Sequence, residues 1–228
     1  MNILAIDTTG APCSCAVLRD GKLVSSVYMN NKLTHSVNLM PIIDEALKLS
    51  DMNIKDMDVF AVTVGPGSFT GIRIGICTVK GFCMLTDKPA VAIDALDVLA
   101  EAVYEKNAYV VPMIDARRGQ VYCAVYKDGR RLCEDKAEDV TALLRELEGR
   151  AVFTGDGAVS YRERIEKNYS EAEFACEPNV YQNAAYAAKI ALKMYNENKT
   201  VSAEELAANY LKKTQAERER LEKEKNNA

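Results

Sequence analysis

The sequence predicts an α/β protein that contains two copies of one βββαβαβα unit, and three observations support this prediction. The chain repeats itself at an offset of 108 residues, and two unrelated hairpins with a shared turn are the alternative explanation. Each copy places an Asp-Gly pair, typical of a tight hairpin turn, between two apolar segments. Each copy then alternates helical and strand patterns. The repeated residues are Ile6, Asp7, Cys15, Ala16, Val17, Asp20 and Gly21, which recur as Ile114, Asp115, Cys123, Ala124, Val125, Asp128 and Gly129.

The first copy is regular. Apolar and β-branched residues predict strands near 3–7, 13–19 and 22–28, and Asp20-Gly21 predicts the turn between the last two. A helix is expected from Thr34, with Pro41 bending its early turns. A strand over 58–64, a helix from Ser68 to about Met84, a strand over 90–93 and a helix opened by Asp94 complete the unit.

The second copy is less regular. It predicts strands near 109–115, 121–127 and 130–134, a helix over 138–148, a strand over 151–155, a helix after Asp156 and a helix over 182–195. A final charged helix is expected over about 203–225. We therefore expect a first lobe over 1–106, a second over 107–202 and a cleft between them. Chain termini often pack together, which allows the final helix to pack back on the first lobe.

The composition excludes several classes of protein. With 228 residues, of which 48% are hydrophobic and 27% charged, the chain can bury a core and is not disordered. Its net charge of −4 disfavours autonomous nucleic-acid binding. The start lacks a basic segment and no apolar run reaches membrane-spanning length, so neither export nor a membrane location is expected. Seven cysteines without a CxxC pair indicate free thiols and a cytoplasmic protein.

The most specific segment is VTVGPGSFTGIRIG, residues 62–75. Ser68 or Thr70 can cap the helix that follows, and the helix N-terminus favours an anion, although a plain strand-to-helix turn has the same residues. Glycines at a spacing of four leave one helix face without side chains, which suits either close packing inside the lobe or a subunit interface. These glycines are Gly67, Gly71 and Gly75.

A second group of loop residues fits a nucleotide site. Asp7, Thr8 and Thr9 follow the first strand, and Asp115 is the repeat partner of Asp7. If both loops faced one cleft, the carboxylates could hold hydrated magnesium and the hydroxyls could touch phosphate. Asp and Thr are also ordinary turn residues, and the second loop lacks the glycines that wrap phosphate closely. We therefore interpret Asp7, Thr8, Thr9 and Asp115 as a vestigial nucleotide-binding set.

Other chemistry has little support in the sequence. His35 is the single histidine, which excludes histidine-rich metal sites, and at a helix start it suits a capping or surface role. No cysteine has a neighbouring base or metal-ligand spacing, so no catalytic or metal residue is predicted. Arg117-Arg118 and Arg130-Arg131 form local basic pairs that could touch RNA held by another subunit, or could be ordinary surface charge.

Several motifs together resemble the bacterial TsaB family, also called YeaZ. They are AIDTT at 5–9, HSVNLMPIIDEAL at 35–47, VGPGSFTGIRIG at 64–75, MIDARRGQVY at 113–122, TGDGA at 154–158 and YLKKTQAERE at 210–219. The resemblance implies the two-lobe fold of actin, Hsp70 and sugar kinases (ASKHA). It also implies a role in making threonylcarbamoyladenosine beside the anticodon of ANN-decoding tRNAs, as the non-catalytic partner of the transferase TsaD.

The family resemblance implies further properties of the chain. TsaD-type proteins carry an HxxxH metal pair, and the comparable segment here, 92–102, has no histidine. The resemblance implies that this chain requires no cofactor and that the complex uses ATP and magnesium. It also implies that the chain helps to recruit the ATPase TsaE and that it contacts tRNA only indirectly. Asn209 and Lys212 replace the proline and arginine that are frequent in the family.

The expected TsaD interface lies on helices 34–48 and 68–84, where added bulk at a glycine should block binding but leave the lobe folded. The candidate interface residues are His35, Leu39, Ile42, Ile43, Phe69, Gly71, Ile72, Gly75 and Val79. Two other functions stay open: an ATP-dependent small phosphotransferase that uses the cleft, and a self-associating regulatory module that forms a homodimer when alone. No residues support the protease activity once ascribed to the family.

Overall fold

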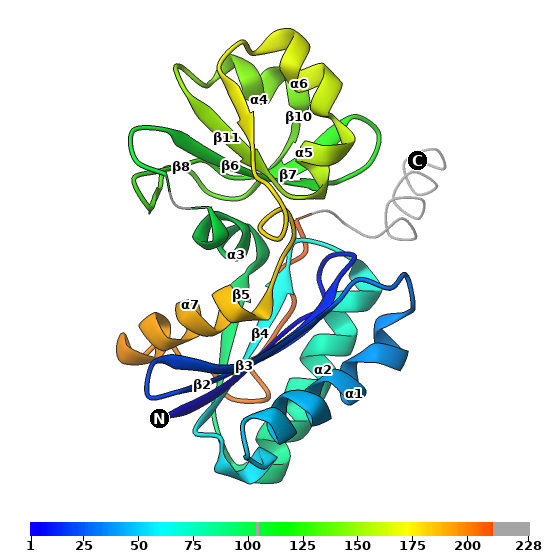
Figure 1. Cartoon of the computed structure of the whole chain (residues 1–228), viewed down its shortest axis with the longest axis vertical. Helices are drawn as coiled ribbons and strands as arrows, with labels where there is room; N and C mark the ends of the chain where they lie inside the picture. Colours follow the sequence, from blue (N-terminus) through cyan, green and yellow to red (C-terminus); the bar gives the residue numbers. More distant parts are fainter. Residues whose placement is uncertain (104, 212–228) are drawn as a thin grey trace, which may run out of the picture.

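The computed structural model describes residues 1–103 and 105–211 and has two lobes stacked along its long axis (Figure 1). The first lobe contains a five-stranded mixed sheet in the order β3-β2-β1-β4-β5. Strand β1 pairs antiparallel with β2 and parallel with β4. The strands are β1 (Asn2–Asp7), β2 (Cys13–Arg19), β3 (Lys22–Met29), β4 (Val59–Gly65) and β5 (Ala90–Asp94).

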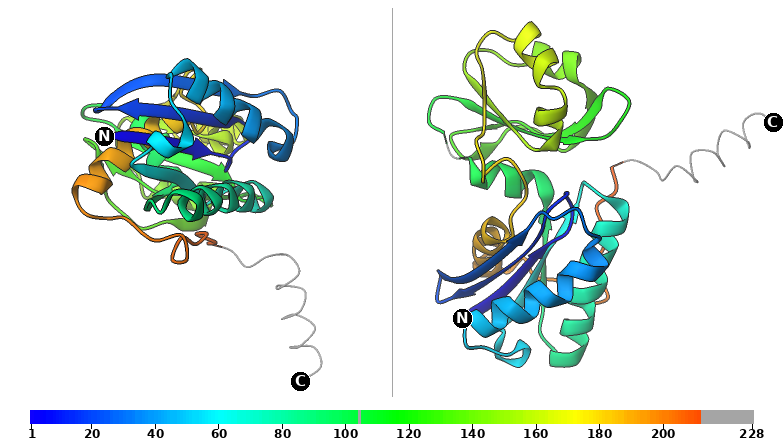
Figure 2. Two further views of the ribbon diagram at one scale, coloured as in Figure 1. Left: turned by 90° about the horizontal axis from the view of Figure 1, so that it is seen from below. Right: turned by 45° about the vertical axis from the view of Figure 1, so that its right-hand side comes forward.

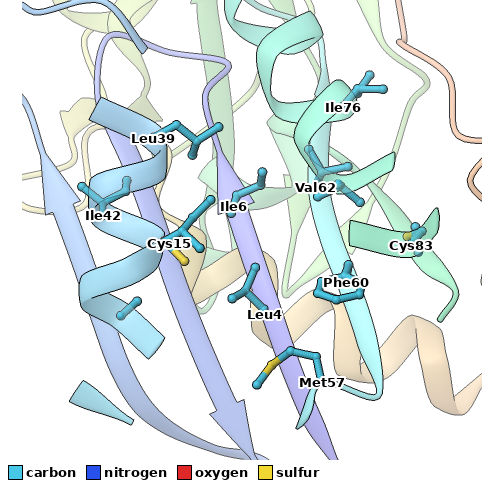
Figure 3. Packing of buried hydrophobic residues seen from close by; sticks show 14 of the residues in the cluster. Leu4, Ile6, Cys15, Leu39, Ile42, Met57, Phe60, Val62, Ile76 and Cys83 are labelled. Carbon is cyan, nitrogen blue, oxygen red and sulfur yellow. The ribbon is translucent and has the colours of Figure 1, made fainter. Parts of the chain in front are cut away.

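Helices cover both faces of this sheet (Figure 2). Helices α1 (His35–Leu49) and α2 (Phe69–Thr86) lie side by side on one face, and α3 (Ala95–Ala102) and α7 (Ala184–Asn196) lie on the other. A short 3₁₀ helix, η1 (Ile54–Asp56), precedes β4. Because side chains alternate along a strand, β1 points Leu4 and Ile6 towards α1 and α2 (Figure 3), and Ile3 and Ala5 towards α7.

The second sheet repeats the strand order of the first. Its path is β10-β7-β6-β11-β12, so β6 corresponds to β1, and a small hairpin, β8-β9, also joins β6. Both Asp-Gly turns adopt the expected left-handed conformation, with φ of 50° and 75° at Asp20-Gly21 and 49° and 74° at Asp128-Gly129. The duplication is therefore confirmed. The strands are β6 (Tyr109–Asp115), β7 (Gln120–Cys123), β8 (Tyr126–Lys127), β9 (Arg130–Arg131), β10 (Lys136–Asp139), β11 (Ala151–Thr154) and β12 (Ala172–Phe174).

Several predicted elements of the second copy were wrong in extent. The helix expected over 138–148 is the shorter α4 (Val140–Arg145), and the helix after Asp156 is two pieces, α5 (Asp156–Ser160) and α6 (Arg162–Asn168). Strands β10 and β12 were not predicted. The Asp139 side chain accepts hydrogen bonds from the backbone N–H groups of Thr141 and Ala142, so it caps α4 and ends β10.

The predicted lobe boundary at 202 was also wrong. Helix α7 packs on the first sheet and not on the second, because its small residues Ala184, Ala187, Ala188 and Ala191 allow close approach to the strands. The second lobe is therefore inserted between β5-α3 and α7 of the first.

The helix expected over about 203–225 is not formed in its described part. Residues 203–211 form a turn followed by extended chain, and 212–225 lie outside the described residues. This segment does return to the first lobe, as expected. Val201 exchanges backbone hydrogen bonds of 2.8 and 2.9 Å with Ala90, and Leu206 is buried in the first-lobe core. We call residues 201–211 the C-terminal strap.

Candidate functional site

The loop after β1 packs into the glycine face of α2. The Thr8 hydroxyl donates a 2.7 Å hydrogen bond to the carbonyl of Gly71. A Cβ atom at Gly71 would lie 2.0 Å from the Thr8 carbonyl oxygen, and one at Gly75 would lie 2.5 Å from the Thr8 hydroxyl. The glycine spacing therefore serves packing inside the lobe. Added bulk at these glycines would disrupt the fold, which corrects the expectation that the lobe would stay folded.

Asp7 is buried beneath this loop, with 1% of its surface exposed. Its Oδ1 accepts hydrogen bonds from the Thr9 backbone N–H at 2.9 Å and the Thr9 hydroxyl at 2.8 Å. Burial raises the pKa of the Asp7 carboxyl, although the hydrogen bonds from Thr9 act in the opposite direction. Asp7 and Thr8 thus hold the loop together through the Oδ1 atom and the hydroxyl, and the Asp7 Oδ2 atom is buried without a hydrogen-bond partner among the described residues.

The matching loop of the second lobe is more open. Asp115 accepts hydrogen bonds from the Arg117 backbone N–H at 2.8 Å and the Tyr161 hydroxyl at 3.1 Å, and it forms a 3.2 Å ion pair with the Arg117 guanidinium. The Asp115 backbone N–H donates to the Asp156 carboxylate at 3.0 Å. Burial raises the pKa of Asp156, and the nearby Asp115 charge raises it further. Asp115 from this loop and Asp156 from the start of α5 therefore both line the space between the lobes.

Both loops line one inter-lobe cleft of about 610 Å³. Of the four nucleotide-site candidates, the structure brings Thr9 and Asp115 to this cleft and leaves Asp7 and Thr8 outside its lining. The Ser68 hydroxyl caps α2 at the cleft wall, as expected, by accepting a hydrogen bond from the Gly71 N–H. Among the described residues, no three His, Cys, Asp or Glu side chains lie close enough to hold a metal ion.

The C-terminal strap forms another wall of the cleft, which sequence reasoning missed. The Asn209 N–H donates to the Val64 carbonyl at 2.8 Å, and its side-chain amide donates to Asp135 of the second lobe at 3.0 Å and to Asp94 of the first at 3.4 Å. Arg131 continues this network to Asp135 and, at 3.2 Å, to Asp97. The network ties the two lobes together beside the cleft.

The strap also ends on the exposed start of α2. The Tyr210 ring lies 5.0 Å from the Phe69 ring, and its hydroxyl accepts a 3.0 Å hydrogen bond from Arg73. The Asn209-Tyr210-Leu211 segment was the available sequence signal, but the contacts of Tyr210 on α2 lie more than a hundred residues earlier in the chain.

Most of the predicted interface residues are buried within the first lobe, so that prediction was wrong for them. Apolar residues at helical spacing mark the face that packs on the sheet, and a partner can touch only the opposite face. His35 and Phe69 keep partial exposure, and a ring nitrogen of His35 lies 3.0 Å from the Gly10 carbonyl oxygen. The buried ones are Leu39, Ile42, Ile43, Gly71, Ile72, Gly75 and Val79.

The exposed sides of α1 and α2 carry a different apolar set. Val37 is 58% exposed and Met40 is 53% exposed, both on α1. The large apolar residues exposed on these two helices are Val37, Met40, Leu49, Phe69, Met84 and Leu85, and we call this set the outer helix face. Scattered apolar residues are ordinary on surfaces, but two adjacent helices that both carry them are typical of an interaction surface.

Helix α2 also bears on the membrane expectation. Within the described ranges it is long and apolar enough to cross a membrane by length and composition alone, which the sequence analysis did not expect. Its buried residues, which are 33% of the segment, belong to the core that it forms with β4.

Two lobes with repeated mixed sheets, helices on the sheet faces and a cleft between the lobes define the actin, Hsp70 and sugar-kinase class of fold. A hexokinase from Thermus thermophilus shares this fold, with 12% sequence identity, a TM-score of 0.51, and coverage of 86% of this chain and 100% of that chain. The solved structure of YeaZ from Pseudomonas aeruginosa is more similar, with a TM-score of 0.80, 27% identity, and coverage of 92% of this chain and 99% of that chain.

Sequence comparison agrees with the structural match. The family model described as TsaD, tRNA N6-adenosine threonylcarbamoyltransferase, matches residues 27–225. The Bacillus subtilis tRNA threonylcarbamoyladenosine biosynthesis protein TsaB is 32% identical over 173 residues, which are 73% of this chain and 76% of that protein. The chain belongs to the TsaB (YeaZ) family.

Proposed function

We propose that this protein is a non-catalytic subunit in tRNA threonylcarbamoyladenosine biosynthesis. In this role it binds and activates a TsaD-type transferase and helps to recruit a TsaE-type ATPase, for threonylcarbamoyl transfer to ANN-decoding tRNAs. The names of its relatives support the pathway. A non-catalytic role is supported by the segment 92–102, which lacks the histidine pair of the transferases. We place the protein in the cytoplasm, with ATP and magnesium used by the complex.

The outer helix face is the observation that most supports a binding role. It displays large apolar side chains on two neighbouring helices of the first lobe, and their buried neighbours hold the helices rigidly on the sheet. A partner with a similar helix pair would remove these side chains from water. When the partner is absent, the same face is available to a second copy of the chain, which would give a homodimer.

The cleft gives the phosphotransferase alternative little support. Asp7, one of the two carboxylates that could hold magnesium if both loops faced one cleft, is buried, and its Oδ1 accepts two hydrogen bonds from Thr9. Asp115 at the end of β6 and Asp156 at the start of α5 both line the cleft, and carboxylates there disfavour a phosphate group. We therefore treat the cleft as a remnant of the fold's nucleotide site.

The decisive experiment measures threonine incorporation into an ANN-decoding tRNA. The mixture contains a TsaC-type enzyme, TsaD, TsaE, ATP and bicarbonate, with and without this chain. We expect incorporation only when both this chain and TsaD are present. Incorporation that does not change when the chain is omitted would contradict the proposed function.

A variant pair tests the binding face. Val37→Asp and Met40→Asp should each weaken TsaD binding at least tenfold, about 1.4 kcal/mol, because each buries an unpaired charge in the interface. Leu23→Asp is the matched control, since Leu23 is 53% exposed and pairs with Leu18, which belongs to the sheet face covered by α7, opposite α1 and α2. Calorimetry measures the affinities, and light scattering of the same variants alone tests the homodimer. Equal affinities for all three variants would exclude this face.

A further inference from the structure

The turn between β6 and β7 has an unusual conformation for its residues. Arg117 and Arg118 both have positive φ, 66° and 57°. Side chains with a Cβ atom disfavour this region because the Cβ crowds the backbone carbonyl, and Gly, Asn and Asp are the usual occupants. The other described non-glycine residues with positive φ follow this preference except for Lys32: they are Asp20, Asp51, Asp87, Asn107, Asp128 and Asn198. The backbone conformation of this turn therefore does not account for two adjacent arginines.

The turn is held firmly by its surroundings. The Ala116 N–H donates to the Gln120 carbonyl at 3.0 Å, and the Gln120 N–H donates to the Arg117 carbonyl at 3.3 Å. The Gly119 N–H donates to the Tyr161 hydroxyl at 3.2 Å. A rigid support of this kind can maintain a strained backbone, and strain of this kind is concentrated at functional sites.

The arginine side chains point into solvent. The Arg117 side chain is 86% exposed and keeps one ion pair, to Asp115. Arg118 is exposed and has no ion-pair or hydrogen-bond partner among the described residues. A third guanidinium lies beside them: Arg164 uses Nε and Nη2 to bind Thr141 and Asp139, and its Nη1 lies 3.6 Å from the position of a Cβ at Gly119.

We propose that the Arg117-Arg118 turn contacts phosphate groups of the RNA substrate directly; this rests on the proposed function above. Guanidinium groups match phosphate geometry with paired N–H donors. The cleft behind the turn contains Asp115 and Asp156, whose carboxylates disfavour a nucleotide phosphate inside it. The arginines lie on the exposed side of the turn, where the phosphates of an RNA backbone can reach them. The direct contact goes beyond the indirect one expected from the family resemblance, and the acidic remainder of the chain explains why it would need the transferase to hold the RNA.

The test uses the full chain in complex with a TsaD-type transferase and a labelled ANN-decoding tRNA transcript. The double variant Arg117→Gly/Arg118→Gly removes both charges and relieves the strained backbone. We expect it to weaken tRNA binding about threefold to tenfold and to lower the slope of log affinity against log salt by about one to two. The thermal midpoint of the isolated variant should stay equal or rise, because glycine favours positive φ. Arg130→Ala, an exposed arginine on the neighbouring hairpin, is the control for general charge and should leave binding unchanged.

Three results would overturn the proposal. One is unchanged tRNA affinity and salt slope in the double variant, and another is an equal loss with Arg130→Ala. The third is a loss confined to ATP binding, measured in a separate arm without tRNA, which would assign the turn to a free nucleotide. If threonine incorporation still requires the chain while any of these holds, only this inference fails. If incorporation never requires the chain, the proposed function fails instead.

Discussion

Leu206→Ala tests whether the C-terminal strap is part of the first-lobe core. Leu206 is 1% exposed and packs among core residues of a lobe whose other strands and helices come mostly from the first hundred residues. Truncation of a buried leucine to alanine costs about 2–5 kcal/mol of the free energy of unfolding. If the strap detaches from the lobe in the variant, so that no cavity remains, the loss in the free energy of unfolding equals the free energy of docking the strap. That free energy includes the Val201–Ala90 and Asn209–Val64 backbone hydrogen bonds.

For a chain of this size each kcal/mol lowers the thermal midpoint by about 2–4 °C, so we expect a decrease of about 4–20 °C. Thermal denaturation followed by far-ultraviolet circular dichroism measures it. Leu23→Ala, at an exposed position, should change stability by about 0.5 kcal/mol or less. A midpoint for Leu206→Ala that matches this control would refute the reasoning, because the strap would then add nothing to the core.

Two further predictions concern the loop after β1 and the helix that it contacts. Gly75→Ala should destabilise the fold by about 1–3 kcal/mol, because its Cβ would lie 2.5 Å from the Thr8 hydroxyl. Gly81→Ala in the same helix meets nothing within 4 Å and should stabilise by up to about 1 kcal/mol; urea denaturation of both variants should give opposite signs. Asp7→Asn tests the buried carboxyl. Since the pKa of Asp7 is raised in the folded state, wild type loses stability as pH rises from the ordinary carboxyl range through that raised pKa, while the amide does not. The stability difference should therefore shift in favour of the variant as the pH rises above the ordinary carboxyl range of about 4, and a pH-independent difference would contradict the assignment.

The parts of the fold that the sequence predicted are those set by local chemistry. The Asp-Gly turns, the Asp94 and Ser68 caps and the duplicated strand pattern each depend on residues within a few positions of one another. The placement of α7 and of the strap depends on contacts with β1, β4 and β5 across the whole length of the chain, and no local pattern specifies which sheet an alanine-rich helix will cover.

The same distinction explains the errors at the site. Helical periodicity identified the apolar face of α1 through Leu39, Ile42 and Ile43, but it marks the core side, so the partner surface had to be found from exposure. The repeat correctly paired Asp7 with Asp115, yet their environments differ, because one is buried beneath Thr8 and Thr9 and the other faces the cleft.

The insertion of the second lobe has a consequence for synthesis on the ribosome. The first sheet is translated early, but α7 and Leu206, which complete its two faces, emerge only after the whole second lobe. The second lobe therefore has all its own elements once its last strand has emerged, while the first lobe, whose strands emerge earlier, waits about a hundred residues for the helix that covers one of its faces. The first lobe thus completes its folding after the second, although most of it is translated earlier. We therefore expect the first half of the chain to need protection from aggregation during translation.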